Sequence, residues 1–277
     1  MAFAGSTDLQ EFAMPSAFPE STAPPAAAPR RTGLPLTPVY TAQAPVFRLV
    51  CFAGAGASAG FFRFWRCFGG TAISVEAFQP RGRESRWHRE RPTLRHSVQE
   101  AASAILKSQP EGQSLVLFGH SFGALLAYET AQALRRTPAR AAHLFAAARA
   151  APHMAPHSSL AADLPDAALT ARMRRIGLDD QQILDHPALG PLFLGSLRHD
   201  LRQNAQYAHC HEQPLQCPVT AFSGVHDPLA PPLAMANWQQ ATTGGFRHIR
   251  LNGSHFFPVA RPARLAGLVK STLGGFS

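Results

Sequence analysis

The chain has 277 residues, 45% of them hydrophobic, which is enough for one sizeable core. No apolar run approaches the roughly 20 residues needed to span a bilayer, and the sequence does not start with a basic segment followed by an apolar one, so we expect neither a membrane span nor a signal peptide. The net charge of +9 suits nucleic acid, an anionic membrane or an acidic protein as partner, but there is no zinc-finger spacing, RNP motif or heptad basic region, so we do not expect nucleic acid.

Residues 1–42 are rich in Pro, Ala, Ser and Thr, a composition that buries little surface. We therefore expect a disordered or loosely attached extension over 1–42 and one folded domain over 43–277.

Strands and helices alternate through most of this domain. Apolar runs predict strands at 46–53, 72–78, 114–120, 142–148, 218–224 and 246–251. Helical spacing predicts helices at 61–68, 95–107, 123–136, near 232–241 and at the C-terminal end. Such alternation is typical of a mostly parallel sheet with helices on both faces. Residues 153–212 contain only helical segments, so we expect a helical insertion there, and such insertions often act as lids.

The motif Gly119-His120-Ser121-Phe122-Gly123 lies between a predicted strand and a predicted helix. A nucleophile elbow requires this context, with glycines that leave room for a strained turn. The start of the helix also directs free backbone N–H groups at the place where an oxyanion would form. Ser121 is therefore a candidate nucleophile, and the alternative is an inert serine in a tight glycine-rich turn.

A serine nucleophile needs a base, and in this architecture the acid and then the histidine follow it along the chain. His255 comes directly after the last predicted strand, in a loop that can reach the carboxyl edge of the sheet. His248 lies inside that strand and is expected to be half-buried or at the surface. The insertion holds three further histidines, His199, His209 and His211.

Asp227 follows the strand predicted at 218–224 and is the candidate acid that orients the imidazole. Its rival is Asp200, on a helix of the insertion. Other aspartates of the insertion look like solvated or capping residues: Asp163, Asp166, Asp179, Asp180 and Asp185.

The loop AGAGASAG, residues 53–60, follows the first strand of the domain and has small residues that let its backbone approach a ligand. The loop in this place usually supplies the second oxyanion donor. A phosphate-binding loop is the alternative, but no GK[ST] sequence follows, and the spacing of Gly54, Gly56 and Gly60 misses the dinucleotide fingerprint.

The four cysteines lie far apart without a CxxC pair, so we expect reduced, mostly packed thiols and a cytoplasmic protein. His209-Cys210-His211 with Cys217 could suggest a metal site. However, adjacent His and Cys side chains do not easily share one tetrahedral ion, and no second ligand pair completes the set, so we expect no metal.

Several stretches together resemble the type II thioesterases, free-standing α/β-hydrolases that accompany polyketide synthases and nonribosomal peptide synthetases. The resemblance covers about residues 46–272 and is carried by LVCFAGAGASAGFFRFW, VEAFQPRGRESR, LFGHSFGALLAYE, LFAAARAAPH, CPVTAFSGVHDPLAP and GSHFF. It implies an α/β-hydrolase fold over 43–277 with a helical lid at about 153–212.

The resemblance also implies the roles of individual residues. The nucleophile would be Ser121, the acid Asp227 and the base His255, and the oxyanion amides would be those of Phe122 and Ala55. No cofactor is implied beyond the phosphopantetheine that the substrate carries on its carrier protein.

Two motifs depart from the pattern of the family. Where the family usually has Pro-His-Ala-Gly-Gly, this chain has Ala53-Gly54-Ala55-Gly56-Ala57. The Pro-Gly-Arg of the family becomes Arg81-Gly82-Arg83.

The resemblance gives the basic charge a partner, an acidic acyl or peptidyl carrier protein, and we expect a monomer. Arg81, Arg83 and Arg86 are candidate contacts for the carrier, while a solvated loop or internal ion pairs are the alternatives.

The leading hypothesis is hydrolysis of acyl thioesters on a carrier protein, in an editing role. Two alternatives stay open: a carboxylesterase or lipase with the same three residues, and a non-catalytic protein that binds carriers.

Overall fold

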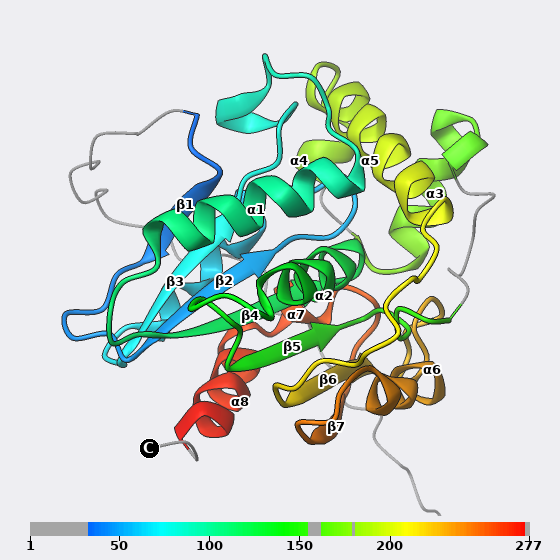
Figure 1. Ribbon diagram of the computed structural model, residues 1–277. Helices are drawn as coiled ribbons and strands as arrows, with labels where there is room; N and C mark the ends of the chain where they lie inside the picture. The colour runs from blue at the N-terminus through cyan, green and yellow to red at the C-terminus, as the bar shows by residue number, and fades with distance from the viewer. Residues whose placement is uncertain (1–32, 155–161, 179–180, 275–277) are drawn as a thin grey trace, which may run out of the picture. The chain divides into compact units, whose positions relative to one another are not determined.

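The computed structural model describes residues 33–154, 162–178 and 181–274 (Figure 1). The chain divides into two units, Met1–Thr32 and Gly33–Ser277, and the first lies wholly outside the described residues. The predicted extension therefore lies outside the described residues as far as residue 32.

Seven strands form one sheet in the order β1-β3-β2-β4-β5-β6-β7. They are β1 (Leu36–Tyr40), β2 (Phe47–Phe52), β3 (Ile73–Phe78), β4 (Ser114–His120), β5 (His143–Ala147), β6 (Val219–Gly224) and β7 (Phe246–Leu251). Strand β1 runs antiparallel to β3, and all other neighbours are parallel. The predicted mostly parallel sheet is confirmed.

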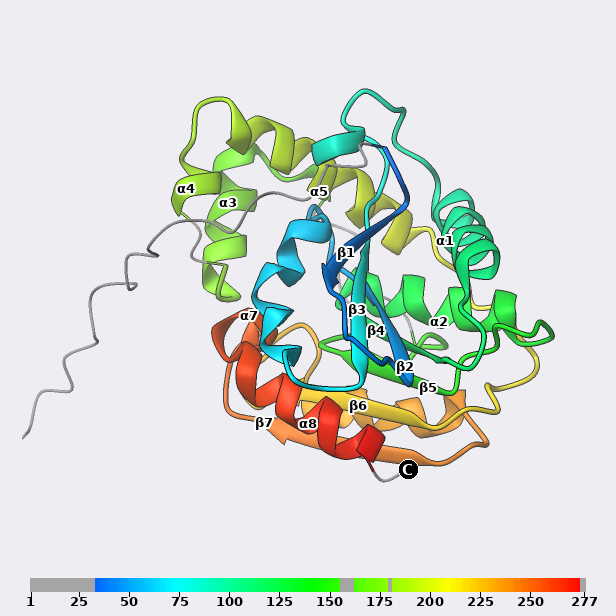
Figure 2. The same cartoon turned by 90° about the vertical axis from the view of Figure 1, so that its left-hand side faces the viewer.

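Helices cover both faces of the sheet, as Figure 2 shows. One face carries α1 (Leu94–Ser108) and α2 (Phe122–Leu134); the other carries the 3₁₀ helix η1 (Ala59–Phe68) and α8 (Pro262–Gly274). In β4, Leu115 and Leu117 pack in the core of the first face, while Val116 and Phe118 pack in the core of the second. A strand that is buried on both faces needs a continuous apolar run, which is why the sequence predicts these strands well.

Strand β1 corrects the boundary of the predicted extension. Leu36 is buried, and the strand pairs with β3 from Leu36 to Tyr40, so residues 36–42 belong to the folded domain. The strand contains Pro38, which has no backbone N–H to donate to a neighbouring strand. An edge strand tolerates a proline because one of its sides has no neighbouring strand. The proline-rich composition therefore hid a strand at the edge of the sheet.

The segment that connects β2 to β3 is helical, as predicted, but it forms a 3₁₀ helix rather than an α-helix. Its buried aromatic residues, Phe62, Trp65 and Phe68, recur every three positions. A helix with three residues per turn places all of them on one side, against the sheet.

Within residues 153–212, the part that the structure describes contains helices and no strand, as expected for a helical insertion. Its helices are α3 (Asp166–Arg175), α4 (Gln181–Leu184) and α5 (Leu189–Ala205). They lie together near the loops that follow the strands, with α5 against the segment that precedes α1 (Figures 1 and 2). Asp179 and Asp180 lie outside the described residues.

The remaining helices are short: η2 (Glu84–Arg86), α6 (Pro232–Ala236), η4 (Asn237–Ala241) and α7 (Phe257–Ala260). The helix predicted near 232–241 is thus divided into α6 and η4. Among the described helices, none is long and apolar enough to cross a membrane.

All four cysteines are free, but Cys67 and Cys210 are exposed, so the prediction of packed thiols holds only for Cys51 and Cys217.

Candidate active site

Ser121 occupies the turn between β4 and α2, with φ 53° and ψ −124°. A residue other than glycine rarely adopts a positive φ, so the turn is strained and depends on the surrounding contacts to hold it. The Ser121 amide donates to the carbonyl of Ala147 at 2.8 Å, which ties the turn to β5. A Cβ at Gly119 would overlap the backbone of Gly123, and one at Gly123 would overlap the backbone of Phe52. Both glycines are therefore required by close packing of the backbone.

His255 joins Ser121 to Asp227 through two hydrogen bonds. Its Nε2 lies 2.9 Å from Ser121 Oγ, and its Nδ1 lies 2.9 Å from Asp227 Oδ2. Ser121 follows β4, Asp227 follows β6 and His255 follows β7, so three separate loops at the carboxyl edge of the sheet supply the set. His255 and Asp227 are buried, whereas Ser121 is partly accessible.

The environment of Asp227 favours its carboxylate form. Oδ1 accepts hydrogen bonds from the amides of Leu229 and Ala230, at 2.9 and 3.2 Å. Burial acts to raise the pKa of Asp227, but the hydrogen bond and charge of His255 and the two amides outweigh it and lower the pKa below its ordinary value. An ionised Asp227 only accepts, so Nδ1 of His255 donates to it and Nε2 is left to accept the Ser121 hydroxyl proton.

His120 is a neighbour of the site that sequence reasoning missed as a functional residue. Burial, together with the nearby His255, lowers the pKa of His120 to about 3, so the ring is neutral near pH 7. Its Nε2 donates to the carbonyl oxygen of His255 at 2.9 Å, and its ring stacks on Phe61 with centroids 5.1 Å apart. His120 thus holds the backbone that carries His255, and its place beside Ser121 in the motif is the signal that could have found it.

The two amides predicted as oxyanion donors belong to segments next to Ser121. Phe122 is the first residue of α2, and Ala55 is in the loop after β2. A Cβ at Gly54 would lie 3.4 Å from Ser121 Cβ, so this loop runs against the serine. Neither amide hydrogen-bonds to another group within the described part of the chain. Both N–H groups are therefore free to donate to a ligand.

Asp200, the rival acid, has other partners than His255, whose Nδ1 bonds to Asp227. Its carboxylate accepts from the Gly56 amide at 2.9 Å and pairs with Arg83 Nη2 at 2.5 Å. His248 is also elsewhere: it is half-buried, as predicted, and its Nε2 lies 2.9 Å from Ser223 Oγ.

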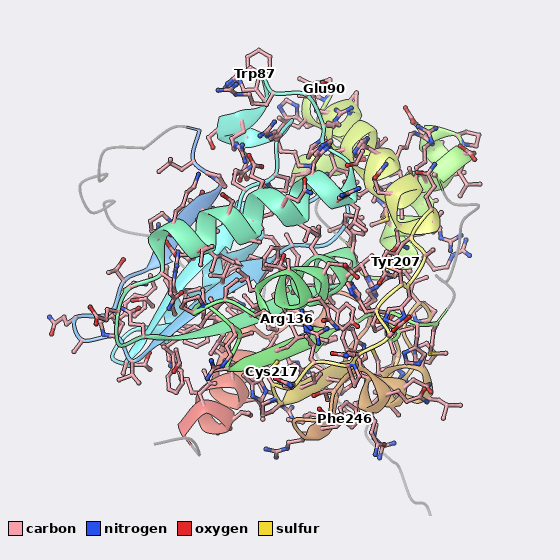
Figure 3. The ribbon with its side chains drawn as sticks, viewed as in Figure 1. Trp87, Glu90, Arg136, Tyr207, Cys217 and Phe246 are labelled. Carbon is pink, nitrogen blue, oxygen red and sulfur yellow. The ribbon has the colours of Figure 1, made fainter. Side chains whose placement is uncertain are left out.

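The histidines of the insertion have partners of their own. His199 Nε2 donates to the carbonyl of Pro92, His209 lies 3.1 Å from the Tyr128 hydroxyl, and His211 lies 2.8 Å from Glu129 Oε2. The Tyr207 hydroxyl donates to Glu129 as well, and Figure 3 shows this tyrosine beside α2. Tyr207, His209 and His211 join the segment after α5 to α2, whereas His199 joins α5 itself to the segment before α1.

The arginines suggested as carrier contacts are largely internal. Arg83 and Arg86 are buried, Arg83 against Asp200 and Arg86 against Glu100 at 2.6 Å, so the structure contradicts their role as surface contacts. Arg81 also pairs with Glu100 but is half-exposed. The tip of the same loop presents Trp87, 75% exposed, on the outside of the molecule (Figure 3).

A serine on the strand-to-helix turn of a mostly parallel sheet, with a histidine and an aspartate on later loops, is the arrangement of the α/β-hydrolases. Comparison with known proteins gives the family. The pattern of the family described as "Thioesterase domain" matches residues 47–273. Thioesterase PikA5 of Streptomyces venezuelae is 36% identical over 82% of this chain and 80% of its own length.

Two solved structures are similar over most of the domain. RedJ, a thioesterase from the prodiginine biosynthetic pathway of Streptomyces coelicolor, is 36% identical, with a TM-score of 0.75 over 82% of this chain and 86% of its own. BorB, a type II thioesterase from the borrelidin biosynthetic cluster, is 25% identical, with a TM-score of 0.77 over 85% of this chain and 96% of its own. The chain belongs to the thioesterase domain family. It is a thioester hydrolase with an α/β-hydrolase fold, which confirms the resemblance seen in the sequence.

Proposed function

We propose that the protein hydrolyses acyl thioesters from the phosphopantetheine arm of carrier proteins in a polyketide or nonribosomal peptide assembly line, and that Ser121, His255 and Asp227 perform the reaction. The observation that carries the proposal is the chain of two 2.9 Å hydrogen bonds from Ser121 through His255 to Asp227. The pathways named for RedJ and BorB support the kind of substrate.

In the first half of the reaction, Ser121 Oγ attacks the thioester carbonyl while His255 Nε2 takes its proton. Asp227 accepts the hydrogen bond from Nδ1 and stabilises the imidazolium that forms. The tetrahedral intermediate places a negative charge on the former carbonyl oxygen, and the amides of Phe122 and Ala55 donate to it. The C–S bond then breaks, the thiol leaves with the proton from His255, and the acyl group remains on Ser121.

In the second half, a water molecule replaces the thiol. His255 takes a proton from the water as it attacks the acyl ester, and the same two amides stabilise the second tetrahedral intermediate. Collapse returns the proton to Ser121 Oγ and releases the carboxylic acid. Both halves use the same amide donors and the same base, so a substitution that displaces either of them slows both halves.

Access to Ser121 lies on the side of the helical insertion. Helix α5 contacts the loop after β2 through Asp200 and the start of α1 through Gln203, whose side-chain oxygen accepts a hydrogen bond from the Leu94 amide at 2.9 Å. The insertion therefore borders the place where an acyl chain and its phosphopantetheine arm must enter, which is the position of a lid.

A substrate panel tests the proposal. The rates kcat/KM are measured on one acyl group presented as a carrier-protein thioester, a coenzyme A thioester and a nitrophenyl ester. We expect the carrier-bound thioester to be hydrolysed with the highest kcat/KM. A preference for the simple ester would replace the proposal with a carboxylesterase or lipase.

The non-catalytic alternative is tested by labelling with a fluorophosphonate, which reacts with activated serines. We expect labelling of the wild-type protein and none of the Ser121→Ala variant, with unchanged labelling of Ser254→Ala as a control beside the site. A wild-type protein that is not labelled would point to a binding protein.

A further inference from the structure

The loop after β2 has one backbone hydrogen bond of its own, from the Ala57 amide to the Gly54 carbonyl at 3.1 Å, and depends on other segments for further support. Residues 53–57, Ala-Gly-Ala-Gly-Ala, carry no polar side chain, yet this loop must present the Ala55 amide to the reacting carbonyl. The Gly56 amide and the Ala57 carbonyl are held from other parts of the chain.

Asp200 of α5 is the first of these supports. It is 5% exposed, and its Oδ2 accepts the Gly56 amide proton at 2.9 Å. Gly56 has φ +78°, and a Cβ there would lie 2.9 Å from the Phe193 ring and 3.0 Å from Leu197 Cβ. Because α5 is packed directly on Gly56, the carboxylate and the helix together fix the peptide that follows Ala55.

Arg83 is the second support. It is 9% exposed, pairs with Asp200 Oδ1 at 2.5 Å, and donates through Nη1 to the carbonyl of Ala57 at 2.6 Å. Gln79 holds Arg83 in turn: its Nε2 donates to the Arg83 carbonyl at 3.0 Å, and its Oε1 accepts the Ala59 amide proton at 3.1 Å.

These contacts grip the loop at residues 56, 57 and 59. A peptide chain has only two soft torsions per residue, so fixing the Gly56 N–H and the Ala57 carbonyl leaves the neighbouring Ala55 amide little freedom. A buried carboxylate is costly unless it is paired, and Arg83 supplies the opposite charge beside Asp200. Asp200 and Arg83 therefore work as one unit.

We infer that Asp200 and Arg83 are positioning residues that aim the Ala55 amide at the oxyanion, so that the insertion helix α5 takes part in building the oxyanion site. The inference rests on the proposed function only in assigning the Ala55 amide to the oxyanion, whichever acyl substrate is used. Neither residue touches the reacting atoms; each acts through the backbone of the loop.

The test compares Asp200→Asn with wild type on both an acyl-carrier thioester and a nitrophenyl ester. A misplaced oxyanion donor weakens transition-state binding, so we expect kcat to fall about 100-fold while KM changes by less than about threefold. The pH at which activity rises to half its maximum should not move, since His255 and Asp227 are untouched. Asp166→Asn is the matched control. It removes an exposed carboxylate of α3 that pairs with Arg198 of α5, the helix that carries Asp200, and should keep kcat within about twofold.

Arg83→Lys is a milder second variant. It keeps a positive charge but loses the planar fork that bridges Asp200 and the Ala57 carbonyl, so we expect kcat to fall about tenfold. If Asp200→Asn does not fold, as judged by circular dichroism, this variant decides. In the double variant the two losses should not multiply, because the residues act as a unit.

Three results would overturn the inference: kcat within about twofold of wild type in a folded variant, a raised KM with unchanged kcat, or a shifted pH profile. The measurements on the nitrophenyl ester distinguish a failure of this inference from a failure of the proposed function. If the wild type hydrolyses only the ester, the carrier substrate is wrong, yet the effect of Asp200→Asn on ester hydrolysis still tests the loop.

Discussion

Replacing Asp227 by asparagine should remove most of the activity without disturbing the fold. The substitution keeps the size of the side chain, but one oxygen becomes an NH₂ group. The amides of Leu229 and Ala230 donate to Oδ1, so the remaining oxygen must stay there and the NH₂ group must face His255. His255 Nδ1 then has to accept, its proton moves to Nε2, and Nε2–H points at Ser121 Oγ, where it can no longer take the serine proton.

The size of the effect follows from the cost of the opposite orientation. Turning the NH₂ group toward the two amides would lose two hydrogen bonds and bury three donors against each other, at about 1–3 kcal/mol for each unsatisfied group. The orientation in which the side-chain oxygen faces His255, which catalysis needs, is therefore populated at about one part in a hundred or less. The carboxylate charge that stabilises the imidazolium is also lost. We expect kcat to fall by about 10²–10⁴.

The assay is kcat at saturating acyl-carrier substrate, together with the rate of fluorophosphonate labelling, which should fall in parallel. Asp163→Asn is the control: within the described part of the chain that exposed carboxylate pairs with Arg202, at 3.3 Å, and its loss should leave kcat within about twofold. An Asp227→Asn variant with kcat within about tenfold of wild type would refute the tautomer argument.

Two further predictions concern stability. Burial lowers the pKa of His120 to about 3 and that of His143 to about 4, while a histidine of the unfolded chain takes up its proton near pH 6.5. The free energy of unfolding should therefore be highest above pH 6.5. It should fall by about 2 kcal/mol per histidine between about pH 6.5 and pH 5, because only the unfolded chain binds these protons. In urea denaturation at the two pH values, His143→Leu should lose about 2 kcal/mol less than wild type, and an equal loss would contradict the role of burial. Gly123→Ala should lower the free energy of unfolding by about 2–3 kcal/mol or more, because its Cβ would overlap the backbone of Phe52. The control Gly267→Ala, on α8 with nothing within 4 Å, should be neutral or slightly stabilising, and similar melting temperatures for the two variants would argue against the packing account.

The sequence predicts the central strands closely because their burial on both faces leaves a plain signal. The central strand β4, Ser114–His120, matches the predicted range, and β6 begins one residue later than predicted. The edge strand β1 was missed because an edge accepts Pro38 and carries a weaker apolar pattern. The 3₁₀ form of η1 was missed because a short run of aromatic residues fits more than one helical period.

The candidate site is predictable to the extent that it follows the order of elements. Ser121, Asp227 and His255 each follow a predicted strand, and parallel strands bring such loops to one edge. The support of the oxyanion loop depends on a contact between Gly56 and Asp200, which are 144 positions apart, and on the packing of α5. No local pattern encodes that contact, so Asp200 could be listed only as a rival acid, and the burial of Arg83 could not be foreseen.

The most direct test of the central claim is hydrolysis of an acyl-carrier thioester by the Ser121→Ala variant, followed by mass spectrometry of the quenched reaction. We predict that the wild type transiently carries the acyl group on the peptide that contains Ser121 and that the variant releases acid no faster than buffer alone. Release of acid by a folded Ser121→Ala variant at a rate within about tenfold of wild type would contradict the account.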